Sequence, residues 1–290
     1  MTSSTHPGAW WHEQTFGIGV TNALKMQKLY ATRSEFQEIE VYEHETFGRV
    51  LVLDGTVQLS EADEFIYHEM AVHVPLLGRR RKQVEALIIG GGDGGILRET
   101  LKSPNVSRVV MVEIDPLVVE ISNRWIGCQG DYDDPRVTLL YADGIQYMAQ
   151  SAAAGQRFDL IIIDATDSTS PSKTLWSAPF YQSLAACLKD DGVCVDSDIL
   201  AHGKDQVRLS RDPCDVSVFD LIESQQYFAG VEGYYSKVPL YPGGYFAFFL
   251  YTKDRISHAN PYQEYHGRYY NAGAHRAAFA LPTWWRKLLH

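Results

Sequence analysis

A glycine-rich turn between a buried strand and a helix is the feature that most constrains the fold of this chain. Residues 84–89 are rich in apolar side chains, and Gly90-Gly91-Gly92-Asp93-Gly94-Gly95 follows them directly. Glycines at such a position let the backbone turn tightly and approach a ligand closely. A helix is predicted over residues 95–102, so the turn has the strand–turn–helix context of a nucleotide-binding loop.

The segments after this turn alternate between predicted strands and helices. Helices are expected from Pro116 and over residues 179–188. Strands are expected over residues 109–112, 137–141, 158–163, 192–195 and 245–251. Such alternation is typical of a parallel sheet that helices cover on both faces, so an α/β fold is predicted.

The part of the chain before residue 60 has a β pattern instead. Residues 37–42 alternate charged and apolar side chains, as a half-buried strand does. Asp54-Gly55 suits a tight hairpin turn between strands at residues 49–53 and 56–59. Ser60 is placed to cap a helix, which is predicted to run to about Val74 and to end at Pro75.

Composition excludes several classes of protein. The net charge of −10 argues against a nucleic-acid partner, because phosphates select for basic surfaces. No stretch approaches the ~20 apolar residues that cross a bilayer, and no secretory signal is visible, so we expect a cytoplasmic protein without a membrane partner. The four cysteines form no metal-ligand pattern, and neither a metal site nor a permanently bound cofactor is predicted.

Acidic residues follow the ends of the predicted strands. Glu113-Ile114-Asp115 begins 18 residues after Gly95, where an acid can bind ribose hydroxyls. Asp143-Gly144 follows the next strand and Asp164 the one after it. The carboxyl ends of parallel strands lie at one edge of a sheet, where such sheets bind ligands. Any one of these acids could simply cap a helix, but as a set they indicate a nucleoside site.

Asp93 narrows the choice of nucleoside. Its negative charge at the start of the helix would repel the pyrophosphate of a dinucleotide and attract a cation. The charge is equally unfavourable for the carboxylate of S-adenosylmethionine. The charge suits a donor that carries only a propylamine and a sulfonium. The alternative interpretation is that Asp93 points into solvent and contacts no ligand.

Long stretches of the chain resemble the spermidine synthase family, in particular its enterobacterial form. The most specific are residues 47–77 (FGRVLVLDGTVQLSEADEFIYHEMAVHVPLL), 88–99 (IIGGGDGGILRE) and 269–282 (YYNAGAHRAAFALP). The resemblance implies a methyltransferase-like Rossmann domain with a mostly parallel sheet, preceded by a small N-terminal β-domain. We accordingly expect a loose tail over residues 1–10, the β-domain with a connecting helix over 11–75, and the catalytic domain over 76–290. A homodimer or homotetramer is also implied.

The resemblance further implies a site for decarboxylated S-adenosylmethionine as co-substrate, for the methylthioadenosine product, and for a polyamine. The donor residues implied are Gln37, Gly90, Gly92, Asp93, Glu113, Asp143, Gly144 and Pro171. The polyamine residues implied are Tyr67, His68, Asp93, Asp164, Asp167 and Tyr241. An ammonium must lose a proton before it can attack carbon, and Asp164 is expected to accept that proton as the general base.

The chain departs from the family pattern near the expected acceptor. The family's loop reads D-[ST or C]-[ST]-D-P-x-G-P, whereas residues 164–171 read DATDSTSP. Asp196-Ser197-Asp198 stands where the family carries Ala-Gln or Thr-Gln, and residues 200–216 differ as well. Aminopropyl transfer to putrescine is the predicted activity. The alternatives are transfer to cadaverine, spermidine or agmatine, a methyltransferase using intact S-adenosylmethionine, and a paralogue that binds polyamine without turnover.

Overall fold

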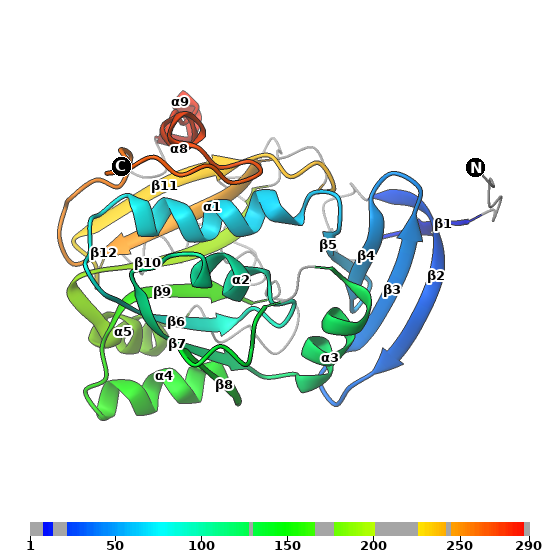
Figure 1. Cartoon of the computed structure of the whole chain (residues 1–290), viewed down its shortest axis with the longest axis horizontal. Helices are drawn as coiled ribbons and strands as arrows, with labels where there is room; N and C mark the ends of the chain where they lie inside the picture. Colours follow the sequence, from blue (N-terminus) through cyan, green and yellow to red (C-terminus); the bar gives the residue numbers. More distant parts are fainter. Residues whose placement is uncertain are drawn as a thin grey trace.

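The computed structural model describes most of the chain. The described residues are 8–13, 22–127, 130–165, 177–200, 226–241 and 245–286, with residues 198–200, 245, 284 and 285 described by their backbone alone. Asp167 and Pro171, two of the predicted site residues, lie outside this set. The described chain forms two sheets that lie side by side, as Figure 1 shows.

The N-terminal sheet is antiparallel, with its five strands in chain order. The strands are β1 (Ala9–His12), β2 (Ala23–Arg33), β3 (Glu38–His44), β4 (Gly48–Leu53) and β5 (Thr56–Ser60). Asp54 and Gly55 turn between β4 and β5 with φ angles of 46° and 75°, which gives the predicted hairpin. The strand β1 begins at Ala9, within the segment 1–10 that was predicted as a loose tail. The predicted division of the chain between residues 75 and 76 stays a prediction.

The second sheet has seven strands in the order β11-β12-β10-β9-β6-β7-β8. They are β6 (Val84–Gly90), β7 (Val106–Glu113), β8 (Val137–Tyr141), β9 (Phe158–Asp164), β10 (Leu188–Leu200), β11 (Gly230–Ser236) and β12 (Tyr245–Thr252). The five from β10 to β8 run parallel, and β12 pairs antiparallel with both of its neighbours. The prediction of a mostly parallel α/β sheet behind a small β-domain is therefore confirmed.

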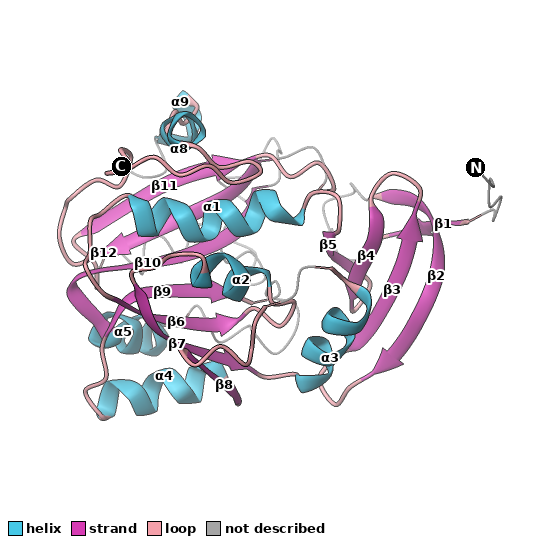
Figure 2. Cartoon of the chain, in the orientation of Figure 1, coloured by secondary structure: helices cyan, strands magenta, loops and turns pink. Residues whose placement is uncertain are grey.

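Helices cover both faces of this sheet, and Figure 2 distinguishes them from the strands. The helices α1 (Glu64–Leu77) and α2 (Gly95–Leu101) pack on one face, while α4 (Gly144–Ala153) and α5 (Ala178–Cys187) pack on the other. The helix α3 (Pro116–Trp125) packs on the N-terminal sheet and links it to the larger one. Two short helices, α8 (Ala272–Ala278) and α9 (Thr283–Arg286), lie near the C-terminus. Among the described residues, no helix has the length and apolar character that crossing a membrane requires.

The helix α1 differs from its prediction at both ends. It begins at Glu64, and the Ser60 hydroxyl donates to Oδ1 of Asp63 over 2.6 Å instead of capping the helix. The prediction that Pro75 ends the helix was also wrong, because Pro75 lies within it. Proline removes one backbone donor, but burial of Leu76 and Leu77 stabilises the last turn, and Gly78 N–H bonds to the Val74 carbonyl over 2.9 Å.

Candidate active site

The glycine loop after β6 is held against the end of β9. Gly90, Gly91 and Gly94 have φ angles of 83°, 77° and 86°, in the left-handed region that favours glycine. The Gly91 N–H donates to the Asp164 carbonyl over 2.9 Å, and a Cβ added to Gly90 would lie 2.0 Å from the same oxygen. Only a glycine fits there, and this close approach brings Asp93 and Asp164 to the same edge of the sheet.

A cavity of about 190 Å³ opens beside this loop, between the two sheets. It is lined by every predicted donor residue that the structure describes: Gln37, Gly90, Gly92, Asp93, Glu113, Asp143 and Gly144. Apolar walls come from Leu51, Leu53, Ile89, Val112 and Val118. An apolar cavity with a few polar groups at one rim has the character of a small-molecule site.

Glu113, at the end of β7, is a buried acid that lines this cavity. Burial raises the pKa of Glu113 to about 7, although its Oε1 accepts a hydrogen bond from the Asp115 N–H over 2.8 Å. Asp115 itself caps α3 and accepts a bond from the Gln37 side-chain amide over 2.9 Å. That bond holds the side chain of Gln37, which also lines the cavity.

Asp143 caps a helix, which is the structural role that the sequence left open for each of the acids. Its Oδ1 accepts the backbone N–H groups of Ile145 and Gln146 over 2.8 and 3.3 Å, so it caps α4. Gly144 allows α4 to approach β6 closely, since a Cβ there would lie 2.5 Å from the Ile89 side chain. Both residues still line the cavity.

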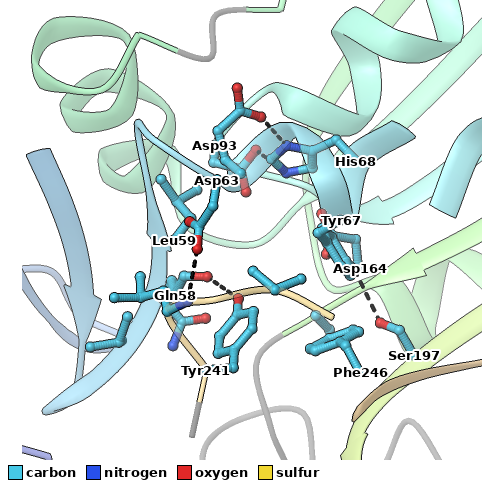
Figure 3. Close-up of a pocket in the computed structure, with 15 residues that line it drawn as sticks. Gln58, Leu59, Asp63, Tyr67, His68, Asp93, Asp164, Ser197, Tyr241 and Phe246 are labelled. Carbon is cyan, nitrogen blue, oxygen red and sulfur yellow. Dashed lines mark hydrogen bonds and ion pairs between the residues drawn. The ribbon is translucent and has the colours of Figure 1, made fainter. Parts of the chain in front are cut away.

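A second cavity, of about 70 Å³, adjoins the first and is shown in Figure 3. Tyr67, His68, Asp93, Asp164 and Tyr241 all line it, so it gathers every predicted polyamine residue that the structure describes. Asp93 and Asp164 line both cavities, as Gln58 and Ala165 do. The two cavities therefore meet at a pair of carboxylates.

Tyr67 connects Asp164 to the neighbouring strand. Its hydroxyl donates to Oδ1 of Asp164 over 2.6 Å and lies 3.0 Å from the hydroxyl of Ser197 on β10. Burial and the nearby charge of Asp93 raise the pKa of Asp164 to about 6, while His68 and the Tyr67 hydrogen bond oppose that shift. A carboxylate with this pKa is ionised at neutral pH and can accept a proton.

His68 lies between two carboxylates. Its Nδ1 is 2.5 Å from Oε2 of Glu64, and its Nε2 is 3.3 Å from Oδ1 of Asp93, which also accepts the Gly95 N–H. Burial opposes protonation, but Asp93 and Glu64 together raise the pKa of His68 to about 10. Ligand atoms of His68, Asp93 and Asp164 lie within 4.8 Å of one another. Because both ring nitrogens of His68 face carboxylates, His68, Glu64 and Asp93 form an ion network beside Asp164.

Aromatic rings and a backbone carbonyl complete the smaller cavity. The Tyr241 hydroxyl donates to the Gln58 carbonyl, and Phe246 packs against both Tyr241 and Tyr67, with ring centroids 5.2 and 4.9 Å away. Gln58, Glu64 and Ser197 were not among the predicted site residues. The four-residue spacing of Glu64 and His68 on a helix could have indicated Glu64. The sequence indicated Ser197 only as part of the segment 196–198, which departs from the family pattern near the expected acceptor.

The fold and the two cavities define a Rossmann-type transferase. The larger cavity, with its glycine loop and its acid after β7, suits a nucleoside. The smaller one, with carboxylates and aromatic rings, suits an ammonium group.

Comparison with known proteins identifies the family. A spermine/spermidine synthase domain model matches residues 64–260, and a spermidine synthase tetramerisation domain model matches residues 9–61.

Curated relatives and solved structures agree with the family models. The polyamine aminopropyltransferase of Salmonella arizonae is 37% identical over 94% of this chain and 95% of its own, and that of Serratia proteamaculans is 36% identical over 88% of each. A spermidine synthase crystallised with the transition state analogue AdoDATO superposes with a TM-score of 0.84 at 30% identity, over 100% of this chain and 98% of its own. Spermidine synthase from Thermotoga maritima superposes with a TM-score of 0.83 at 29% sequence identity, over 100% of this chain and 98% of its own. The chain belongs to the spermidine synthase family and is a polyamine aminopropyltransferase.

Proposed function

We propose that the enzyme transfers the aminopropyl group of decarboxylated S-adenosylmethionine to putrescine, and that spermidine and methylthioadenosine are the products. The observation that carries this proposal is the meeting of the two cavities at Asp93 and Asp164. A donor nucleoside in the larger cavity and an amine in the smaller one would bring their reacting atoms together at these carboxylates.

In this proposal the larger cavity binds the donor. Glu113 accepts hydrogen bonds from the ribose hydroxyls, Gln37 binds at the rim, and Asp143 and Gly144 contact the adenine. Gly90 and Gly92 allow the nucleoside to approach the backbone. Asp93 binds the ammonium of the aminopropyl group. We assign Pro171 to the same site from the family resemblance alone.

The smaller cavity binds the acceptor, and Asp164 is the base. The acceptor's ammonium gives a proton to Asp164, and the freed lone pair attacks the methylene carbon of the aminopropyl group next to the sulfonium. A carbon–nitrogen bond forms as the bond between that carbon and sulfur breaks. The sulfonium becomes the neutral thioether of methylthioadenosine, and the new secondary amine takes the positive charge. Tyr67 orients Asp164, while Tyr241 and the neighbouring rings supply faces for the amine. Asp167 is proposed as a second contact from the family resemblance.

A different amine acceptor is the second candidate. The small side chain of Ser197 lines the acceptor cavity, within the segment that replaces the family's Ala-Gln or Thr-Gln, and it leaves space for another amine such as cadaverine. Assembly is proposed from the match of residues 9–61 to a tetramerisation domain. Trp10 on β1 is 66% exposed and is a suitable contact for a homodimer or homotetramer.

Product analysis tests the proposal. The enzyme is incubated with decarboxylated or intact S-adenosylmethionine and with putrescine, cadaverine, spermidine or agmatine, and the products are identified by mass spectrometry. We expect methylthioadenosine and spermidine from the decarboxylated donor and putrescine. Methylated amines from the intact donor contradict the proposed donor, and a preference for another amine contradicts putrescine while it supports the second candidate.

A further inference from the structure

Glu64 lies one helical turn before His68 on α1 and is buried behind it. The exposed fractions are 7% for Glu64 and 1% for His68. Oε2 of Glu64 lies 2.5 Å from Nδ1 of His68 and 2.8 Å from Nη2 of Arg98, which comes from α2. The two contacts hold the Glu64 carboxylate in place, and the carboxylate in turn fixes the positions of His68 and Arg98.

The surroundings of His68 fix the orientation of its ring. A Cβ added to Gly95 would lie 2.2 Å from the imidazole, so the ring packs directly on the start of α2. The ring of Tyr67 contacts it edge-on at 5.2 Å between centroids. In this orientation Nδ1 faces Glu64 and Nε2 faces Asp93, and a rotation of the ring would break both contacts.

The charge of His68 matters because two carboxylates face each other at the junction of the cavities. The charge of Asp93 favours the neutral form of Asp164, after the larger effect of burial, and the charge of His68 favours the ionised form. The proposed reaction needs both acids ionised, one to bind the donor's ammonium and the other to accept a proton. A cation beside Asp93 makes this possible near neutral pH.

We propose that Glu64 is a positioning residue for the transfer reaction: it holds His68 as an imidazolium that orients Asp93 and offsets its charge toward Asp164. Glu64 reaches the reacting groups only through His68. This inference rests on the proposed function, because the base that it affects is the proposed one. The charged or titratable groups that face His68 are Glu64 from α1, Asp93 from the glycine loop, Asp164 from β9, Tyr67 from α1 and, through Glu64, Arg98 from α2.

The substitution Glu64→Gln removes the charge and keeps the size of the side chain. His68 is then a weaker base, so it loses its charge at a lower pH than in the wild type, in which its pKa is about 10. Above the reduced pKa of His68, Asp93 lacks its cationic partner. We expect kcat/KM for the amine to fall by about threefold to tenfold on that alkaline side and to change little near the acid limb, where His68 is still charged. Glu120→Gln, on the exposed face of α3, is the matched control.

Two measurements decide the outcome. A lower pKa of His68, measured by nitrogen NMR, together with a loss of activity confined to the alkaline side of that pKa, supports the proposal. An unchanged pKa of His68, or an equal loss of activity at every pH, overturns it, because a merely structural residue would act at every pH alike. If Glu64→Gln does not fold, His68→Gln keeps an N–H donor and removes the charge at every pH. It should move the acid limb up by about half to one pH unit, because the charge of His68 favours the ionised form of Asp164; an unshifted acid limb there overturns the proposal too. Failure of the wild-type enzyme to transfer an aminopropyl group refutes the proposed function instead, and the NMR titration still tests the network.

Discussion

The hydroxyl of Tyr67 donates a hydrogen bond to Oδ1 of Asp164 over 2.6 Å, and the two residues are 97 positions apart in the sequence. Because the phenolic proton is committed to the carboxylate, the Tyr67 oxygen accepts the hydrogen bond of the Ser197 hydroxyl. The interaction stabilises the ionised form of Asp164 against burial and against the charge of Asp93. Ser197, Tyr67 and Asp164 thus form one hydrogen-bonded chain across β10, α1 and β9.

Removal of the Tyr67 hydroxyl tests this relationship. In Tyr67→Phe the carboxylate loses a donor, so the pKa of Asp164 should rise above its value of about 6. The acid limb of kcat/KM is expected to move up by about one pH unit, since the lost bond favoured the charged form. Tyr262→Phe, a half-buried tyrosine away from both cavities, is the control. A pH profile unchanged from wild type would show that Tyr67 does not act on the base.

Asp93→Asn tests the proposed binding of the donor's ammonium. The loss of a charge-assisted contact should raise the KM for decarboxylated S-adenosylmethionine about tenfold to hundredfold. Since the charge of Asp93 raises the pKa of Asp164, the acid limb should also move down, opposite to Tyr67→Phe. Initial rates at varied donor concentration and pH measure both effects. A donor KM equal to that of wild type contradicts the assignment.

Ser197 is expected to influence the choice of acceptor. Ser197→Gln places a larger side chain in a cavity of about 70 Å³ and should lower kcat/KM for cadaverine more than for putrescine. The KM for the donor should stay the same, because Ser197 does not line the larger cavity. Ser197→Ala removes the hydroxyl without filling the space and should leave the ratio of the two acceptors unchanged. Equal losses for both amines in Ser197→Gln would exclude Ser197 as a determinant of specificity.

Glu113 should link nucleoside binding to pH. Its pKa is raised to about 7, and hydrogen bonds from ribose hydroxyls favour the ionised form. Binding of methylthioadenosine at about pH 7 should therefore release about half a proton, and the affinity should rise with pH until Glu113 is ionised and then level off. Calorimetry in buffers of different ionisation enthalpy measures this release. Glu113→Gln should abolish it, and a release that persists in that variant points to another group.

The positions of the acids at the sheet edge could be predicted because one rule governs them. In a parallel sheet the carboxyl ends of neighbouring strands meet, so Gly90, Glu113 and Asp164 were expected together from the strand pattern alone. The structure pairs Gly90 with Asp164 in register between β6 and β9. The resemblance to a known family added Gln37 and Tyr241, whose sequence neighbourhoods carry no comparable signal.

Contacts between distant elements could not be predicted in the same way. The bond between Tyr67 and Ser197 depends on how α1 packs across β9 and β10, which the hydrophobic pattern of a single helix does not determine. The end of α1 was misjudged for a related reason, since local preference disfavours Pro75 in a helix while burial of Leu76 and Leu77 outweighs it. Asp143 shows the reverse case, because its role as a helix cap follows from local sequence.

The central claim is that Asp164 removes the proton that makes the amine nucleophilic. The most direct measurement is the rate of methylthioadenosine formation by Asp164→Asn from decarboxylated S-adenosylmethionine and putrescine, with the affinity for methylthioadenosine measured in parallel. We predict a kcat lower by about a hundredfold to ten-thousandfold with the nucleoside affinity retained. A variant that binds the nucleoside and still turns over near the wild-type rate would contradict the account.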